Sequence, residues 1–309
     1  MGHTPAMQPE AIRHNFADVN GVRLHYASAG PALGAGAEKL VIFLHGFPEF
    51  WYAWRNQLAE FGRDFLAVAP DMRGYNLSSK PAAVQEYEMS RLVGDVRALA
   101  AHLGARSFYL VGHDWGGVVA WGAAIAFPEL VEKLVIINAP HPAVFSRELR
   151  ENPAQQQASQ YMVLFRTPQA EALISANNFA NFQEGILGEL LRKGIFTEAD
   201  RQAYLAAWSQ PGAITGGLNY YRAAQAGPPD ALLGEAFDPT RGYPSLEVKA
   251  PTLVIWGEQD PYLLPGNLVG LERYVPNLTI ERIPDATHWV VHEKSAQVNS
   301  LMRRFFTKG

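Results

Sequence analysis

The sequence contains no cysteine. This absence excludes disulfide bonds, thiolate metal sites and a cysteine nucleophile, and it leaves the redox compartment open. An excess of one charge is lacking as well, since the formal net charge is −4 and only 18% of the residues are charged. A balance this mild favours neither nucleic acid nor an anionic membrane as a partner. We therefore expect no binding of nucleic acid.

Long apolar runs are missing too. No stretch of the sequence approaches the length of a membrane span, and residues 1–10 hold no apolar core of the kind found in signal peptides. The chain has 309 residues, of which 48% are hydrophobic, enough for one large core or for a core with an insertion. We expect a soluble, cytoplasmic, globular protein.

Apolar runs typical of strands alternate with helical patterns along most of the chain. The strand-like runs lie at 22–27, 40–44, 65–69, 108–111, 134–137, 253–256 and 278–283, and the helical patterns lie at 51–61, 90–103, 117–127 and 296–305. Several strand-like runs are continuously apolar, as buried parallel strands are. The alternation predicts an α/β fold with a mostly parallel central sheet and helices on both faces.

The alternation stops between about residue 140 and residue 243. This block is rich in Ala, Gln, Asn and aromatic residues, and it is predicted to form five helices, at 153–165, 169–179, 184–193, 198–208 and 216–225. We therefore predict three parts. Residues 1–139 and 244–309 form the α/β core, and residues 140–243 form a helical cap inserted into it.

The stretch with the sequence GHDWGG at 112–117 follows a strand-like run and opens a helical one. Small residues around one reactive side chain are typical of a nucleophile elbow, here with Asp114 in the place of serine. The positive end of the helix dipole favours the ionised carboxylate, although an Asp at this point is also a common helix cap. A carboxylate that attacks a saturated carbon leaves an ester, which water can hydrolyse, so the residue type favours displacement followed by hydrolysis.

A second motif, HGFP at 45–48, follows the strand-like run at 40–44. A loop in this position can point a backbone amide at the elbow. We predict that the N–H groups of Phe47 and Trp115 form an oxyanion hole, while the same residues would also suit a plain turn. His45 is interpreted as structural.

His288 is the best candidate for a general base, because it follows the last strand-like run, as the base does in this chain order. Among the other histidines, His102 and His292 fall in helical segments that we expect to be exposed. His113 lies inside the elbow and is expected to point away from the site.

Asp260, just after the run at 253–256, is the best candidate for the acid that orients the base. Glu258 lies two residues earlier and is the competing candidate. Asp71 is interpreted as a structural turn residue.

These motifs together resemble the soluble epoxide hydrolases of the α/β-hydrolase superfamily. The resemblance is carried by HGFPE at 45–49 with the following Trp51 and Trp54, by DMRGY at 71–75 and by GHDWGG at 112–117, and it extends from about Leu24 to Phe305. It implies an α/β-hydrolase fold with a helical cap. The elbow motif alone is shared with haloalkane dehalogenases and does not separate the two groups.

Two cap tyrosines make that separation. Tyr161 precedes an aromatic-x-x-Pro stretch, and Tyr221 lies in an Asn-aromatic-Tyr-Arg sequence. The resemblance implies that both phenols donate hydrogen bonds to an epoxide oxygen, although both rings could simply pack the cap against the core. Phe47 stands where the dehalogenase pattern has Asn, which weakens the dehalogenase interpretation.

The hypothesis is therefore an epoxide hydrolase that forms a covalent aspartyl ester and releases a vicinal diol. It requires no metal and no organic cofactor, and its expected partner is a small apolar epoxide. The Tyr-rich cap could also support a homodimer. Two alternatives stay open, namely a haloalkane or haloacetate dehalogenase with the same Asp nucleophile and a non-catalytic ligand-binding protein of the same fold.

Overall fold

The computed structural model describes residues 12–229 and 245–307. The last part of the predicted cap and its boundary with the core, at 243–244, lie outside these ranges. Within the described residues, no helix combines the length and the apolar character needed to cross a bilayer.

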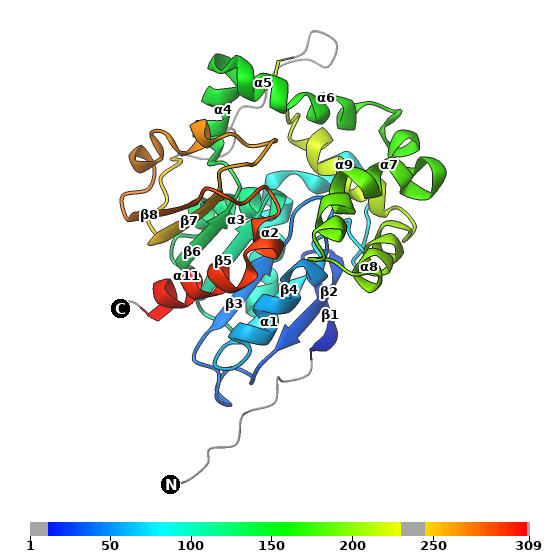
Figure 1. The fold of residues 1–309 in the computed structure, drawn as a ribbon. Coiled ribbons are helices and arrows are strands. Elements are labelled where there is room, and N and C mark those ends of the chain that lie inside the picture. The colour runs from blue at the N-terminus through cyan, green and yellow to red at the C-terminus, as the bar shows by residue number, and fades with distance from the viewer. Residues whose placement is uncertain (1–11, 230–244, 308–309) are drawn as a thin grey trace.

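A single eight-stranded sheet forms the centre of the protein (Figure 1). Its strands are β1 Arg13–Val19, β2 Val22–Ala29, β3 Leu40–Leu44, β4 Leu66–Pro70, β5 Phe108–His113, β6 Val131–Ile137, β7 Thr252–Gly257 and β8 Leu278–Ile283. Their order is β1-β2-β4-β3-β5-β6-β7-β8. The pairs β1–β2 and β2–β4 are antiparallel, and all the others are parallel. The predicted mostly parallel sheet is confirmed.

Helices cover both faces of the sheet, as predicted. Along β3, Leu40, Ile42 and Leu44 join one core cluster, whereas Val41 and Phe43 join the other. This alternation follows from the two-residue period of a strand. The first cluster packs against α2 Met89–His102 and α3 Trp115–Ala126, and the second packs against α1 Arg55–Phe61 and α11 Ser295–Thr307.

Shorter elements complete the core. They are the 3-10 helices η1 Trp51–Trp54, η2 Val84–Tyr87, η3 Pro265–Leu268 and η4 Leu271–Arg273, and the short helix α10 Val290–Glu293.

Helices also fill the chain between β6 and β7, and they gather along one end of the sheet (Figure 1). They are α4 Pro142–Glu151, α5 Pro153–Ala158, α6 Gln160–Arg166, α7 Ala170–Arg192, α8 Glu198–Trp208 and α9 Ala213–Ala223. Among the described residues, this block contains no strand. Its N-terminal signals are local: Asn152 caps α5, and Thr197 with Asp200 forms a capping box at the start of α8.

Three predictions about these helices need correction. Helix α4 was not expected, and the segment predicted as one helix at 153–165 divides at Ser159 into α5 and α6. The helices predicted at 169–179 and 184–193 join as α7, which is kinked at Ala176–Phe179, where Asn177, Asn178 and Phe179 have positive φ. The polar, Asn-containing sequence of this segment tolerates the left-handed conformation at two of these three positions.

Two hydrogen bonds fasten α8 to the loop that follows β3. The Tyr204 hydroxyl donates to Glu49 Oε1 at 2.6 Å, and the indole N–H of Trp208 donates to the carbonyl of Pro48 at 2.7 Å. Both contacts are buried, so they are shielded from competition with water. The helical block is thereby held against the loop that carries Phe47.

Candidate active site

Asp114 occupies the sharp turn between β5 and α3. Its backbone has φ 51° and ψ −126°, a conformation that costs an L-residue roughly 1–3 kcal/mol and that persists only where the surroundings fix it. The flanking glycines provide the room. A Cβ on Gly112 would overlap the backbone of Gly116, and a Cβ on Gly116 would overlap the carbonyl group of Leu44.

The backbone amides of Phe47 and Trp115 were predicted to form an oxyanion hole next to Asp114. The backbone N–H of Phe47 donates to Asp114 Oδ1 at 2.7 Å. Trp115 is the first residue of α3, so its N–H is one of the amides that a helix leaves without an intrahelical acceptor. Gly46 allows this close approach, because a Cβ at its position would overlap the side chain of Asp114.

His288 joins two carboxylates. Its Nδ1 lies 2.7 Å from Asp260 Oδ2, and its Nε2 lies 3.5 Å from Asp114 Oδ2. His288 and Asp260 are each only 3% exposed. Asp260 follows β7 and His288 follows β8, so the carboxyl ends of neighbouring parallel strands bring the predicted base and acid to the predicted nucleophile. Glu258 instead pairs with Arg282 at 2.6 Å.

Asn138, which the sequence analysis missed, fixes the acid. Its side-chain amide donates to Asp260 Oδ2 at 2.8 Å, and its Oδ1 accepts the Gly257 N–H at 2.8 Å. The other oxygen of Asp260 accepts the N–H groups of Tyr262 at 2.8 Å and Leu263 at 3.0 Å. The only sequence signal was a polar residue directly after a buried strand, where ligand and site residues gather in parallel sheets.

The two carboxylates determine the charge of His288. Burial by itself lowers the pKa of an imidazole, but the negative charges of Asp260 and Asp114 and the hydrogen bonds to them outweigh burial and raise the pKa of His288 to about 10. Burial alone would raise the pKa of Asp260, because it disfavours the charged carboxylate. The positive charge of His288 outweighs burial, so the pKa of Asp260 is lowered. At neutral pH the resting site therefore holds an imidazolium between two carboxylates.

Tyr161 in α6 and Tyr221 in α9 line the same cavity as Asp114. This larger cavity, of about 180 Å³, is also lined by Phe47, Phe165, Ile186, Tyr262, His288 and Trp289. A smaller cavity of about 50 Å³ shares Asp114 and both tyrosines and is otherwise lined by mainly apolar side chains, among them Val118, Phe145, Met162 and Leu263. Burial raises the pKa of both Tyr161 and Tyr221 well above the usual range of a tyrosine. The negative charge of Asp114 adds to this effect. Both phenols thus keep their protons and can donate hydrogen bonds.

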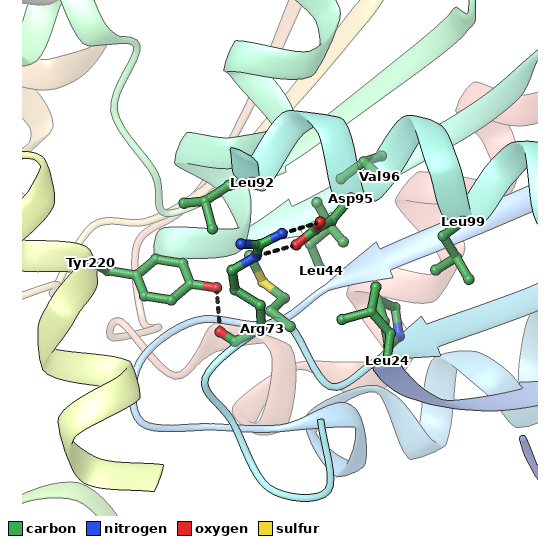
Figure 2. A pocket seen from close by; sticks show the side chains of 10 residues that line it. Leu24, Leu44, Arg73, Leu92, Asp95, Val96, Leu99 and Tyr220 are labelled. Atoms are coloured by element: carbon green, nitrogen blue, oxygen red, sulfur yellow. Dashed lines mark hydrogen bonds and ion pairs between the residues drawn. The ribbon is translucent and has the colours of Figure 1, made fainter. Parts of the chain in front are cut away.

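Tyr220 anchors the helix that carries Tyr221. Its hydroxyl donates to the carbonyl of Arg73 at 2.9 Å (Figure 2). The guanidinium of Arg73 in turn donates from Nε and Nη2 to both oxygens of Asp95 at 2.7 Å. Two adjacent helical residues project in different directions, so the contact of Tyr220 with the core leaves Tyr221 facing the cavity.

The other histidines considered in the sequence analysis have structural contacts or face the solvent. His45 Nε2 accepts the N–H of Met72 at 3.0 Å, and His113 Nε2 contacts the carbonyl of His288 at 2.8 Å. His102 is exposed, as expected. The prediction that His292 is exposed is wrong: it is 6% exposed, because its Nε2 lies 2.6 Å from Oε1 of the buried Glu49 and its ring packs on Phe196.

Asp71 holds a turn together. Its Oδ1 accepts the N–H of Trp51 at 3.0 Å, and its Oδ2 lies 2.6 Å from Nδ1 of His25 and accepts from the Asn76 amide at 2.8 Å. No group of His, Asp and Glu side chains within the described ranges has the arrangement of a metal site.

Comparisons with known proteins identify the family of this chain. The family model described as alpha/beta hydrolase fold matches residues 39–295. The chain is 38% identical to the AB hydrolase superfamily protein YfhM of Bacillus subtilis, over 96% of this chain and 98% of that protein. It is 36% identical to epoxide hydrolase 4 of Mus musculus, over 93% of this chain and 77% of that protein.

Solved structures of epoxide hydrolases are similar to this chain as well. A crystal structure of a mutant epoxide hydrolase from Bacillus megaterium in complex with its product, (R)-3-[1]naphthyloxy-propane-1,2-diol, has a TM-score of 0.86 at 39% identity. The match covers 95% of this chain and all of the other. The chain belongs to the epoxide hydrolases of the α/β-hydrolase fold family.

Proposed function

We propose that this protein hydrolyses an apolar epoxide to a vicinal diol through an ester on Asp114. The observation that carries the proposal is the pairing, in one cavity, of a buried Asp–His–Asp arrangement with two protonated phenols. A serine-type elbow alone would not supply both halves of this chemistry. The apolar lining of both cavities supports an apolar substrate.

In the first step, Asp114 attacks a ring carbon of the epoxide. Because the Phe47 amide holds Oδ1, the other oxygen, Oδ2, is the attacking atom. The carbon–oxygen bond of the ring breaks, and Tyr161 and Tyr221 donate hydrogen bonds to the oxygen as negative charge develops on it. The product is an alkyl ester of Asp114 with a neighbouring alkoxide, which takes up a proton.

Ester formation also prepares the base. The ester is neutral, so His288 loses one of the two charges that stabilise its imidazolium, and its pKa falls. The proton that His288 then releases balances the proton that the alkoxide takes up. The imidazole is left neutral, with Nε2 free to accept a proton and Nδ1 held by Asp260.

In the second step, water attacks Cγ of the ester while His288 Nε2 removes one of its protons. Negative charge develops on Oδ1, where the amides of Phe47 and Trp115 stabilise it. The bond between Cγ and Oδ2 breaks, so the diol leaves with the original oxygen of Asp114. One water proton ends on the diol and the other on His288, which restores the resting ion pairs.

The helices between β6 and β7 act as the cap in this proposal. Tyr161 and Tyr221 come from α6 and α9, whereas Asp114, Asp260 and His288 come from the core, so the site requires both parts of the chain. The cap boundaries at 140 and 243, the cytoplasmic location and the homodimer stay predictions from the sequence.

The test is diol formation from styrene oxide and aliphatic epoxides by the wild type and by Asp114→Asn. We expect the wild type to release diol and the variant, which keeps the shape of the side chain but not its nucleophilic charge, to release none above background. Halide release from short chloroalkanes without any diol from epoxides would instead favour the dehalogenase. Ligand binding without turnover of either class would favour the non-catalytic alternative.

A further inference from the structure

We infer that Tyr262 is a water-positioning residue of the hydrolysis step: its phenol oxygen accepts a hydrogen bond from the second O–H group of the water that His288 activates. This inference rests on the proposed function. It assigns a role to a third phenol of the cavity, distinct from those of Tyr161 and Tyr221.

The first observation is the position of Tyr262 relative to the two cavities. Asp114, Tyr161 and Tyr221 line both of them, whereas Tyr262 and His288 line only the larger one. The hydrolytic water must contact His288, so it has to lie in the larger cavity. At about 180 Å³ that cavity is large enough for a water molecule in addition to other occupants.

The second observation is that the ring of Tyr262 contacts residues of both chemical steps. Its ring stands edge-on to the imidazole of His288, with ring centroids 5.4 Å apart and planes at 85°. It makes a similar contact with Tyr161, at 5.4 Å and 73°. The ring of Tyr262 therefore packs against the residue that removes a proton from water and against one of the residues that hold the epoxide oxygen.

The third observation is that the backbone of Tyr262 is fixed on both sides. Its N–H donates to Asp260 Oδ1 at 2.8 Å, and its carbonyl accepts from the side-chain amide of Gln155 in α5 at 2.8 Å. Gln155 is fully buried, and its own oxygen accepts from Leu264 N–H and from Asn267 Nδ2. A side chain on such a rigid backbone is preorganised for its contacts.

The hydroxyl of Tyr262, by contrast, has no hydrogen-bond partner among the described residues. Burial, together with the charges of Asp260 and Asp114, raises the pKa of Tyr262, so the group stays a neutral phenol with acceptor lone pairs. Of the two O–H groups of the attacking water, one gives its proton to His288 Nε2. The other keeps its proton during the attack and requires a hydrogen-bond acceptor. The indole of Trp289, also in this cavity, can only donate, so Tyr262 is the acceptor on the His288 side.

The experiment separates the two steps in single turnovers. Wild type, Tyr262→Phe and the control Tyr109→Phe are mixed rapidly with styrene oxide. Ester formation is measured by acid quench and mass spectrometry of the protein, and ester decay by loss of that mass. Tyr109 is a suitable control because it lies near the start of β5, at the opposite end of the strand from Asp114, where its ring packs on Phe306.

We expect Tyr262→Phe to form the ester at the wild-type rate and to hydrolyse it roughly 3- to 10-fold more slowly, the effect of losing one hydrogen bond. The ester should then accumulate, and Tyr109→Phe should behave as wild type. A merely structural role would slow both steps together and lower the melting temperature.

Two results would overturn the inference: equal hydrolysis rates in wild type and Tyr262→Phe, or slowing of ester formation to the same extent as hydrolysis. Failure of the proposed function is distinguishable from either, because the wild type itself would then form neither ester nor diol.

Discussion

The charge of Asp114 should control the pKa of His288, and replacing it by asparagine measures that control directly. Asp114 Oδ2 lies 3.5 Å from His288 Nε2. At an effective dielectric constant of about 20, two unit charges at this separation interact by about 5 kcal/mol. Removing the interaction should bring the pKa of His288 from about 10 to roughly 6.5, while Asp260 keeps its contact with Nδ1.

The assay is a pH titration of the histidine ring nitrogens by ¹⁵N NMR, in wild type and in Asp114→Asn. The signal of His102, which is exposed at the end of α2, serves as the internal reference. In the wild type His288 should stay protonated well above neutral pH, and in the variant it should titrate near neutrality. The reasoning is refuted if His288 titrates at the same pH in both proteins, because the ester could then not prepare the base.

Three further predictions follow from the same geometry. Tyr161→Phe or Tyr221→Phe should slow ester formation by roughly 100- to 1,000-fold, the usual effect of losing a donor to a developing oxyanion. A burst experiment in which ester formation keeps its wild-type rate would contradict the donor role. Gly46→Ala should fold but lose roughly 100-fold or more in kcat/KM, because its Cβ would displace the Asp114 side chain. Wild-type activity in a variant that circular dichroism shows to be folded would contradict this close packing of Gly46 against Asp114. The pKa of His288 is about 10 in the folded protein, higher than the 6.5 of a free histidine, so its stabilisation is complete below about pH 6.5 and is lost as the pH rises through about 10. Urea unfolding at pH 6 and pH 9.5 should therefore show a larger loss of stability for wild type than for Asp114→Asn, and equal losses would count against the raised pKa.

The inner strands of the sheet, such as β3, β4 and β7, could be predicted because they are buried on both faces and therefore appear as continuous apolar runs. Strand β1 could not be predicted in this way. It is an edge strand on which only Ala17 is buried, so its sequence carries no apolar pattern. Helix α4 was missed as well. It begins at Pro142, close to the end of the last strand-like run before the insertion, whereas the first helix of the insertion was predicted only from residue 153.

The candidate site divides in the same way. Asp114, Asp260 and His288 each lie directly after a strand or in a recognisable motif, so local sequence indicates them, and the structure brings them within contact distance. Gln155 and Tyr262 carry no such signal. Their places depend on how α5 packs against the loop after β7, a contact between residues 107 positions apart.

The buried environment of His292 illustrates the same limit. A histidine in a short helical segment was expected to be exposed, yet the side chain of Glu49 reaches it from a loop 243 residues earlier in the chain. A buried carboxylate requires partners, and Tyr204, His292 and His113 surround Glu49 at 2.6, 2.6 and 3.3 Å. Only the tertiary structure reveals which residues meet that requirement.

The covalent ester on Asp114 is tested most directly by the origin of the oxygen in the diol. Excess enzyme is mixed with an epoxide in H₂¹⁸O for a single turnover, and the diol is analysed by mass spectrometry. Because Oδ2 of Asp114 attacks the ring and leaves with the product, the first-turnover diol should contain no ¹⁸O, and the label should appear in the protein. A first-turnover diol that carries ¹⁸O would show that water attacks the epoxide directly, and it would contradict the ester mechanism.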